Sequence, residues 1–152
     1  MTRTPGGSAA RRAAAFRKTR EAHQTEVAED YVELIGDLIA ERGEARLTDV
    51  AEHMAVSHAT AAKVLARLKE AGLVKSEPYR SVWLTDAGTS MAERSRGRHQ
   101  VVQTFLLALG LDPLVAEADA EGIEHHVSDE TIAALRALTR QMERDPGGKP
   151  QG

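Results

Sequence analysis

The segment EGIEHH, residues 121–126, brings carboxylates and imidazoles together near the end of the chain. Glu121, Glu124 and His125 stand at positions i, i+3 and i+4, so a helix would direct their oxygen and nitrogen donors to one face. Convergent donors of this kind form a plausible half-site for a divalent cation. A solvated polar patch is the competing interpretation of the same three residues.

Further candidate donors lie earlier in the chain. His99, in the preceding predicted helix, is a possible fourth donor. Asp30 and Glu33 are one turn apart on another predicted helix and project away from its apolar stripe, where charged side chains are usually solvated. The chain has no cysteine, so thiolate sites are excluded and any bound metal would have only oxygen and nitrogen ligands.

The elements that must position these residues are predicted to be mainly helices. The chain has 152 residues, of which 41% are hydrophobic and 3% aromatic, a composition that favours packed helices over sheets. Apolar residues at helical spacing predict a first helix over residues 22–42, ended by Gly43. Residues 1–15 are low in complexity, and we expect them to be disordered.

A tight helix-turn-helix is predicted next. Thr48 is the expected cap of a short helix and Ser57 the cap of the following one. Ala55 departs from the motif, because its turn position usually requires glycine for a left-handed backbone. The apolar segments 73–75 and 82–84 predict a β-hairpin. An ordinary helical hairpin is the alternative, but the β-hairpin favours a winged helix-turn-helix.

The rest of the chain is predicted to be helical. Caps and stops divide it into a long helix from Thr85 or Asp86 to about Leu109, a helix from Asp112 to about His126, and a last helix from Ser128.

The recognition helix of such a domain faces base edges with its first turns. The candidates for the major groove are His58, Ala59, Thr60, Ala62 and Lys63. The more distant basic residues Arg67, Lys75 and Arg80 are better placed for phosphates. The net charge is only −3, yet the first 20 residues carry basic side chains and no acidic one. We therefore expect local rather than overall attraction to DNA.

Several other classes of protein are disfavoured. No apolar run is long enough to cross a membrane, and we expect a cytoplasmic protein without membrane contact. An organellar transit peptide is a weaker interpretation of the Arg-rich start than a flexible basic arm. Neither the Glu-x-x-His pairs of ferritin-like enzymes nor the His-Glu-x-x-His motif of zinc proteases occurs, so we expect no enzyme.

Five segments in order carry a resemblance: DYVE at 30–33, the helix-turn-helix, YRSVWLT at 79–85, RHQVVQTFL at 98–106 and DAEGIEHHVS at 119–128. Over residues 22–140 the chain resembles the diphtheria-toxin-repressor family of metal-dependent regulators, and within it the manganese transport regulators. The resemblance implies a metal site of Asp30, Glu33, His99, Glu121, Glu124 and His125. Iron-type members typically have Met at the position of Asp30 and Cys at that of Glu121, so the oxygen donors here favour Mn²⁺.

The resemblance also implies the function and its parts. We expect a manganese-responsive repressor of manganese-uptake genes that binds a palindromic operator as a homodimer. Its cofactor is expected to be Mn²⁺, two ions per subunit, with Fe²⁺ as the alternative metal. An iron-responsive regulator, or a winged-helix regulator that senses a small organic ligand, is the alternative. The expected division is a flexible basic arm (1–20), a winged helix-turn-helix domain (21–87), an all-helical dimerisation and metal-binding domain (88–144) and a disordered tail (145–152).

Overall fold

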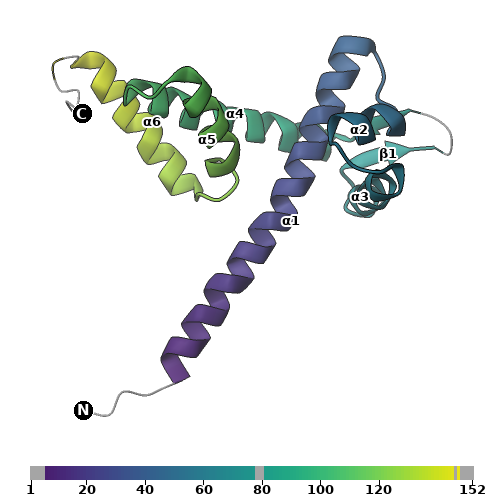
Figure 1. Ribbon diagram of the computed structural model, residues 1–152, viewed down its shortest axis with the longest axis horizontal. Helices are drawn as coiled ribbons and strands as arrows, with labels where there is room; N and C mark the ends of the chain where they lie inside the picture. The colour runs from purple at the N-terminus through teal and green to yellow at the C-terminus, as the bar shows by residue number, and fades with distance from the viewer. Residues whose placement is uncertain (1–5, 78–80, 146, 148–152) are drawn as a thin grey trace.

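The protein consists of two groups of elements, which the helices α1 (Gly6–Arg42) and α4 (Asp86–Ala108) connect (Figure 1). The computed structural model describes residues 6–77, 81–145 and 147. Helix α1 packs with α2, α3 and a small hairpin on one side, and α4 leads from there to α5 and α6 on the other. The mainly helical fold expected from the composition is confirmed. The elements are α1 (Gly6–Arg42), α2 (Leu47–His53), α3 (His58–Glu70), β1 (Val74–Ser76), β2 (Val82–Leu84), α4 (Asp86–Ala108), α5 (Pro113–Ile123) and α6 (Asp129–Arg144).

The first core lies where the C-terminal half of α1 packs on the helix-turn-helix and the hairpin. Ile35 and Leu38 of α1 are almost fully buried there, against Val50 of α2 and Leu65 of α3. The strands β1 and β2 are antiparallel, with Lys75 opposite Trp83. Helices α2 and α3 and the hairpin thus form the predicted winged helix-turn-helix. The apolar stripe of α1 completes its core.

The helix-turn-helix differs from the expectation only at the start of α2. Ser57 caps α3 as predicted, and its hydroxyl accepts a hydrogen bond from the Thr60 amide at 3.1 Å. Ala55 has φ of 54°, the left-handed conformation that the motif requires. Thr48, however, is not the cap of α2: the helix begins one residue earlier at Leu47, and Arg46 stands at the N-cap without a side-chain hydrogen bond.

The second core lies between α4, α5 and α6. Val102 and Leu106 of α4 pack against Ala116 and Ala120 of α5, where the small side chains allow close approach, and against Ile132 of α6. Thr85, Asp112 and Ser128 cap the three helices through their side chains, as the sequence predicted.

Helix α5 ends earlier than predicted, at Ile123 instead of about His126. The reason lies on α4, where Arg98 donates hydrogen bonds from Nε to the Glu124 carbonyl at 2.9 Å and from Nη2 to the Val127 carbonyl. These bonds satisfy the carbonyl oxygens in a turn instead of a continuing helix. Glu124 to Val127 consequently form the α5–α6 turn, the name used below for residues 124–127.

Helix α1 begins earlier than predicted, at Gly6 instead of residue 22. The segment taken for a disordered arm is rich in alanine and arginine, which are strong helix formers, and no glycine or proline interrupts it after Gly7. Its residues 7–20 are exposed, and they extend away from both cores (Figure 1). Within the described residues, no helix is long and apolar enough to cross a membrane.

Candidate metal centre and DNA-binding surface

The six predicted ligands converge at the junction of α1, α4 and the α5–α6 turn. Helix α1 supplies Asp30 and Glu33, and α4 supplies His99. The remaining three come from the end of α5 and the turn. The predicted helix face of Glu121, Glu124 and His125 does not exist as such, because only Glu121 lies within α5. The turn nevertheless brings the three together.

Glu124 is the centre of this cluster. Its Oε2 atom lies 2.7 Å from Nδ1 of His99, and its Oε1 atom lies 3.1 Å from Nε2 of His125. Nδ1 of His99 is also 3.5 Å from Oε1 of Glu121, and Nε2 of His125 is 3.2 Å from Oδ1 of Asp30. Glu124 thus links the two histidines, and His125 in turn contacts Asp30 of α1.

The donor atoms have the environment of metal ligands. The side chains of Glu124 and His125 are only 2% and 1% exposed, so both are removed from water. Several buried polar atoms make no hydrogen bond despite their close neighbours: Oε1 of Glu33, Nδ1 of His99, Oε2 of Glu124 and Nε2 of His125. Buried polar atoms usually have hydrogen-bond partners, and a group of neighbouring donor atoms without hydrogen bonds fits a cation site.

The charges of the cluster perturb its titration. Burial raises the pKa of Glu33, and the carboxylates of Glu124 and Glu121 raise it further. Burial lowers the pKa of His125, but the carboxylates of Asp30, Glu124 and Glu29 outweigh this effect and raise it to about 12. Without metal, the His125 proton therefore partly neutralises the clustered acids.

Sequence reasoning missed two carboxylates that orient the histidines. Nδ1 of His125 lies 2.6 Å from Oε2 of Glu29, and Nε2 of His99 lies 3.3 Å from Oε2 of Glu117. Each leaves the other ring nitrogen facing the cluster, which is how carboxylates commonly fix the tautomer of a ligating histidine. Glu29 sits next to Asp30 and Glu117 one turn before Glu121, but only the tertiary contacts give them this role.

The predicted DNA-binding residues form an exposed surface on α3. His58, Ala59, Thr60, Ala62, Lys63 and Arg67 are all exposed, as is Lys75 on β1. The Thr60 hydroxyl accepts a hydrogen bond from Ser57 at 2.9 Å, which leaves its methyl group free for contact. Arg80 lies outside the described residues. None of the described candidates belongs to the groups of possible metal ligands.

Two family models match this chain. Residues 23–82 match the iron dependent repressor N-terminal DNA binding domain, and residues 85–151 match the iron dependent repressor metal binding and dimerisation domain. Only Trp83 and Leu84 of β2 separate the two matched segments.

Named relatives agree with these matches. The chain is 53% identical over 126 residues to the transcriptional regulator MntR of Escherichia coli O6:H1, which covers 83% of this chain and 81% of the relative. It is 36% identical over 118 residues to a regulator of the same name from Lysinibacillus sphaericus, covering 78% and 85%. A solved manganese-dependent transcriptional repressor in complex with manganese is 34% identical, with a TM-score of 0.65, over 81% of this chain and 57% of that one.

Proposed function

This chain belongs to the iron dependent repressor family, and from that premise we propose that it is a manganese-responsive repressor whose metal site joins the DNA-binding and dimerisation parts. Its relatives are transcriptional regulators, so it is not an enzyme. The manganese named for the solved repressor supports this metal over iron or a small organic effector. We place the boundary between the two domains near residue 87.

The ligands that we propose are Asp30, Glu33, His99, Glu121, Glu124 and His125. The observation that carries this proposal is the set of buried donor atoms around Glu124 that make no hydrogen bond. Bound Mn²⁺ supplies positive charge that offsets the clustered carboxylates. Because these donors come from α1, α4 and the α5–α6 turn, holding them together also sets the position of α1 relative to the dimerisation domain.

The proposed stoichiometry is two Mn²⁺ per subunit. Asp30, Glu33, Glu121 and Glu124 together carry four negative charges when ionised, which two divalent ions balance. The two oxygens of Glu124 face different histidines, as a carboxylate shared between two ions would. No thiolate or thioether belongs to the set, and oxygen donors suit Mn²⁺, although Fe²⁺ is a chemically related competitor.

The DNA partner follows from the winged helix. One chain supplies one recognition helix, and a palindromic operator requires two, about 34–36 Å apart. We propose that a homodimer formed through the C-terminal domain provides this spacing, in agreement with the match to a metal binding and dimerisation domain. Its targets are then genes of manganese uptake, and its place of action is the cytoplasm, where the operator DNA is found.

A manganese titration of operator binding tests the proposal. Glu124→Gln keeps the size of the side chain but removes its charge, and we expect it to abolish most of the manganese-dependent gain in DNA affinity. Glu41→Gln is the control, because Glu41 is exposed at the far end of α1 and takes no part in the cluster. Fluorescence anisotropy with a labelled operator gives both affinities. Equal manganese stimulation in Glu124→Gln and wild type, or full wild-type binding in excess chelator, would contradict the proposed switch.

A further inference from the structure

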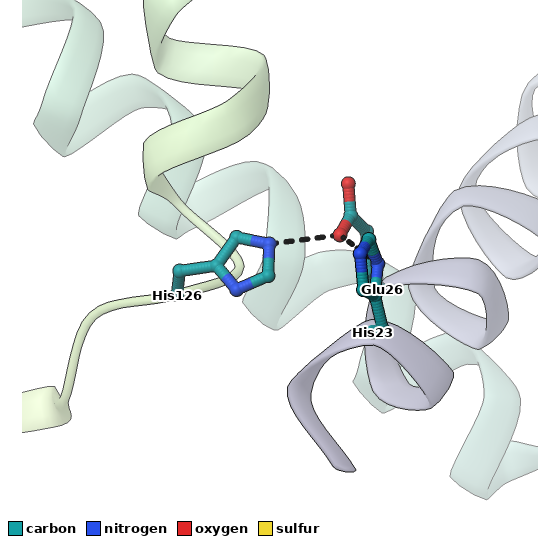
Figure 2. Close-up of side chains that lie close together, drawn as sticks. All are labelled: His23, Glu26 and His126. Carbon is teal, nitrogen blue, oxygen red and sulfur yellow. Dashed lines mark hydrogen bonds and ion pairs between the residues drawn. The ribbon is translucent and has the colours of Figure 1, made fainter. Parts of the chain in front are cut away.

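A second group of possible ligands lies beside the metal centre, and none of its members belongs to the six proposed ligands. It consists of His23 and Glu26 on α1 and His126 in the α5–α6 turn, as Figure 2 shows. His23 and Glu26 are three residues apart, so they share a face of the helix. His126 is 100 residues from Glu26 in the sequence, and its approach is a product of the fold.

The three side chains meet at one carboxylate oxygen. Nε2 of His126 lies 2.8 Å from Oε2 of Glu26, and Nδ1 of His23 lies 3.3 Å from the same atom (Figure 2). The two imidazole rings are 5.8 Å apart at their centres and nearly perpendicular. All three donor atoms lie within 4.8 Å of one another.

These distances suit a tetrahedral ion. With metal–nitrogen and metal–oxygen bonds of about 2.0–2.1 Å, neighbouring ligand atoms of a tetrahedron stand about 3.3 Å apart. The observed contacts of 2.8 and 3.3 Å need only small side-chain adjustments to reach this value. The side chain of His23 is 72% exposed, so an ion has access from solvent and room for a water ligand.

We propose that His23, Glu26 and His126 form an accessory site for a nitrogen-preferring divalent cation such as Zn²⁺. Two imidazoles and one carboxylate are the donor set of open zinc sites, whereas the main cluster is dominated by carboxylates. The accessory site fastens α1 to the α5–α6 turn one helical turn before Asp30. It therefore restrains the same junction as the main centre, through different residues and a different metal preference.

Counting bound zinc tests the proposal in the full-length protein. Equilibrium dialysis with Zn²⁺ alone is expected to find one ion fewer per chain in His23→Ala than in wild type, with the Mn²⁺ stoichiometry unchanged. His53→Ala is the matched control: His53 is an exposed histidine on α2, far from both sites, and its loss is expected to leave the zinc count at the wild-type value. Because His23 is exposed on a helix, its replacement by alanine should not prevent folding.

A second variant and a second measurement identify the site. His126→Gln is expected to lose the same ion, and imidazole nitrogen resonances of His23 and His126 should shift on zinc addition in wild type. The loss of one zinc ion in His23→Ala should also be seen when both proteins carry Glu124→Gln, which separates this site from the proposed manganese centre. Equal zinc counts for wild type, His23→Ala and His126→Gln would overturn the proposal, as would an equal loss in His53→Ala.

Discussion

At the scale of single residues, the environment of each side chain decides its chemistry more than its type does. Glu124 is 2% exposed and faces two imidazoles, whereas Glu41 of α1 is exposed to solvent. Burying a carboxylate is unfavourable unless a positive group compensates it. The protonated His125 supplies this compensation. In the proposed metal site, a bound cation would replace that proton.

Manganese binding should therefore release protons and weaken as the pH falls. The pKa of His125 is raised to about 12, so this group is protonated at neutral pH and must lose its proton to coordinate metal. For each proton displaced, the apparent affinity should drop about tenfold per pH unit. Calorimetry at pH 7 in buffers with different ionisation enthalpies measures the release directly. A binding enthalpy independent of the buffer would show that no proton is displaced.

Lys63 is the residue of the recognition helix whose loss should be most visible. It is exposed on α3 and remote from the metal centre, so Lys63→Ala should weaken operator binding by about 1–3 kcal/mol if it contacts a base, and less if it contacts a phosphate. Manganese affinity should not change. Anisotropy with operator and with unrelated DNA separates the two roles, because a phosphate contact weakens both by the same factor. Unchanged operator affinity would remove Lys63 from the interface.

At the scale of elements, α1 connects the winged helix with the proposed metal centre. Its C-terminal half closes the core of the winged helix, and Asp30 and Glu33 on the same helix belong to the proposed metal centre. Arg96 of α4 donates a hydrogen bond to the Glu33 carbonyl at 3.3 Å and forms an ion pair with Asp37 of α1. A rigid helix that belongs to both sites can transmit a change at one to the other without refolding.

The start of α4 is a second junction between elements, and Gly88 is its critical residue. A Cβ atom at this position would stand 2.0 Å from the carbonyl oxygen of Leu73, which is backbone and cannot move aside like a flexible side chain. Gly88→Ala should therefore destabilise the protein by roughly 1–3 kcal/mol or more through overpacking. Urea unfolding followed by circular dichroism measures the loss.

Gly97 provides the control for this test. It lies on the same helix, and a Cβ atom there would meet nothing within 4 Å. Gly97→Ala should leave stability unchanged or raise it by up to about 1 kcal/mol, because alanine has the higher helix propensity. Equal stability of the two alanine variants would argue against close packing at Gly88.

At the scale of the whole molecule, apolar side chains remain uncovered on the C-terminal domain. Leu114 is 82% exposed and Val115 46%, at the start of α5, and Leu107 and Leu109 at the end of α4 are also exposed. Such surface is unfavourable in water unless a partner covers it. The match of this segment to a metal binding and dimerisation domain makes a second copy of the chain the expected partner.

A charge in this apolar surface should oppose dimerisation. Leu114→Glu would bury a carboxylate without a partner at the interface, and we expect the dimer to dissociate at micromolar concentrations. The same substitution at Leu138, which is 44% exposed on α6, tests whether that helix also belongs to the dimer interface. Sedimentation velocity gives the oligomeric state, and circular dichroism shows whether the monomer stays folded. A Leu114→Glu variant that remains dimeric would place the interface elsewhere.

The sequence by itself determined the features that depend on neighbouring residues. The winged helix and the caps Ser57, Thr85, Asp112 and Ser128 all follow local rules of spacing and capping. The left-handed conformation of Ala55 did not follow from its residue type, because alanine rarely adopts it. The six proposed ligands came from a family resemblance, since the spacing of Asp30 and Glu33 alone does not distinguish a ligand pair from a solvated one.

Only the tertiary structure decided what depends on contacts across the chain. Helix α5 stops at Ile123 because Arg98, on another helix, binds the carbonyls that follow. Glu29 and Glu117 orient the histidines, and His23, Glu26 and His126 meet, because α1 packs beside the α5–α6 turn. The early start of α1 is different, because its alanine and arginine content is a local signal for a helix; the low complexity of the segment had favoured disorder instead. Long-range contacts leave no periodic pattern in the sequence, and for that reason they were found only in the folded chain.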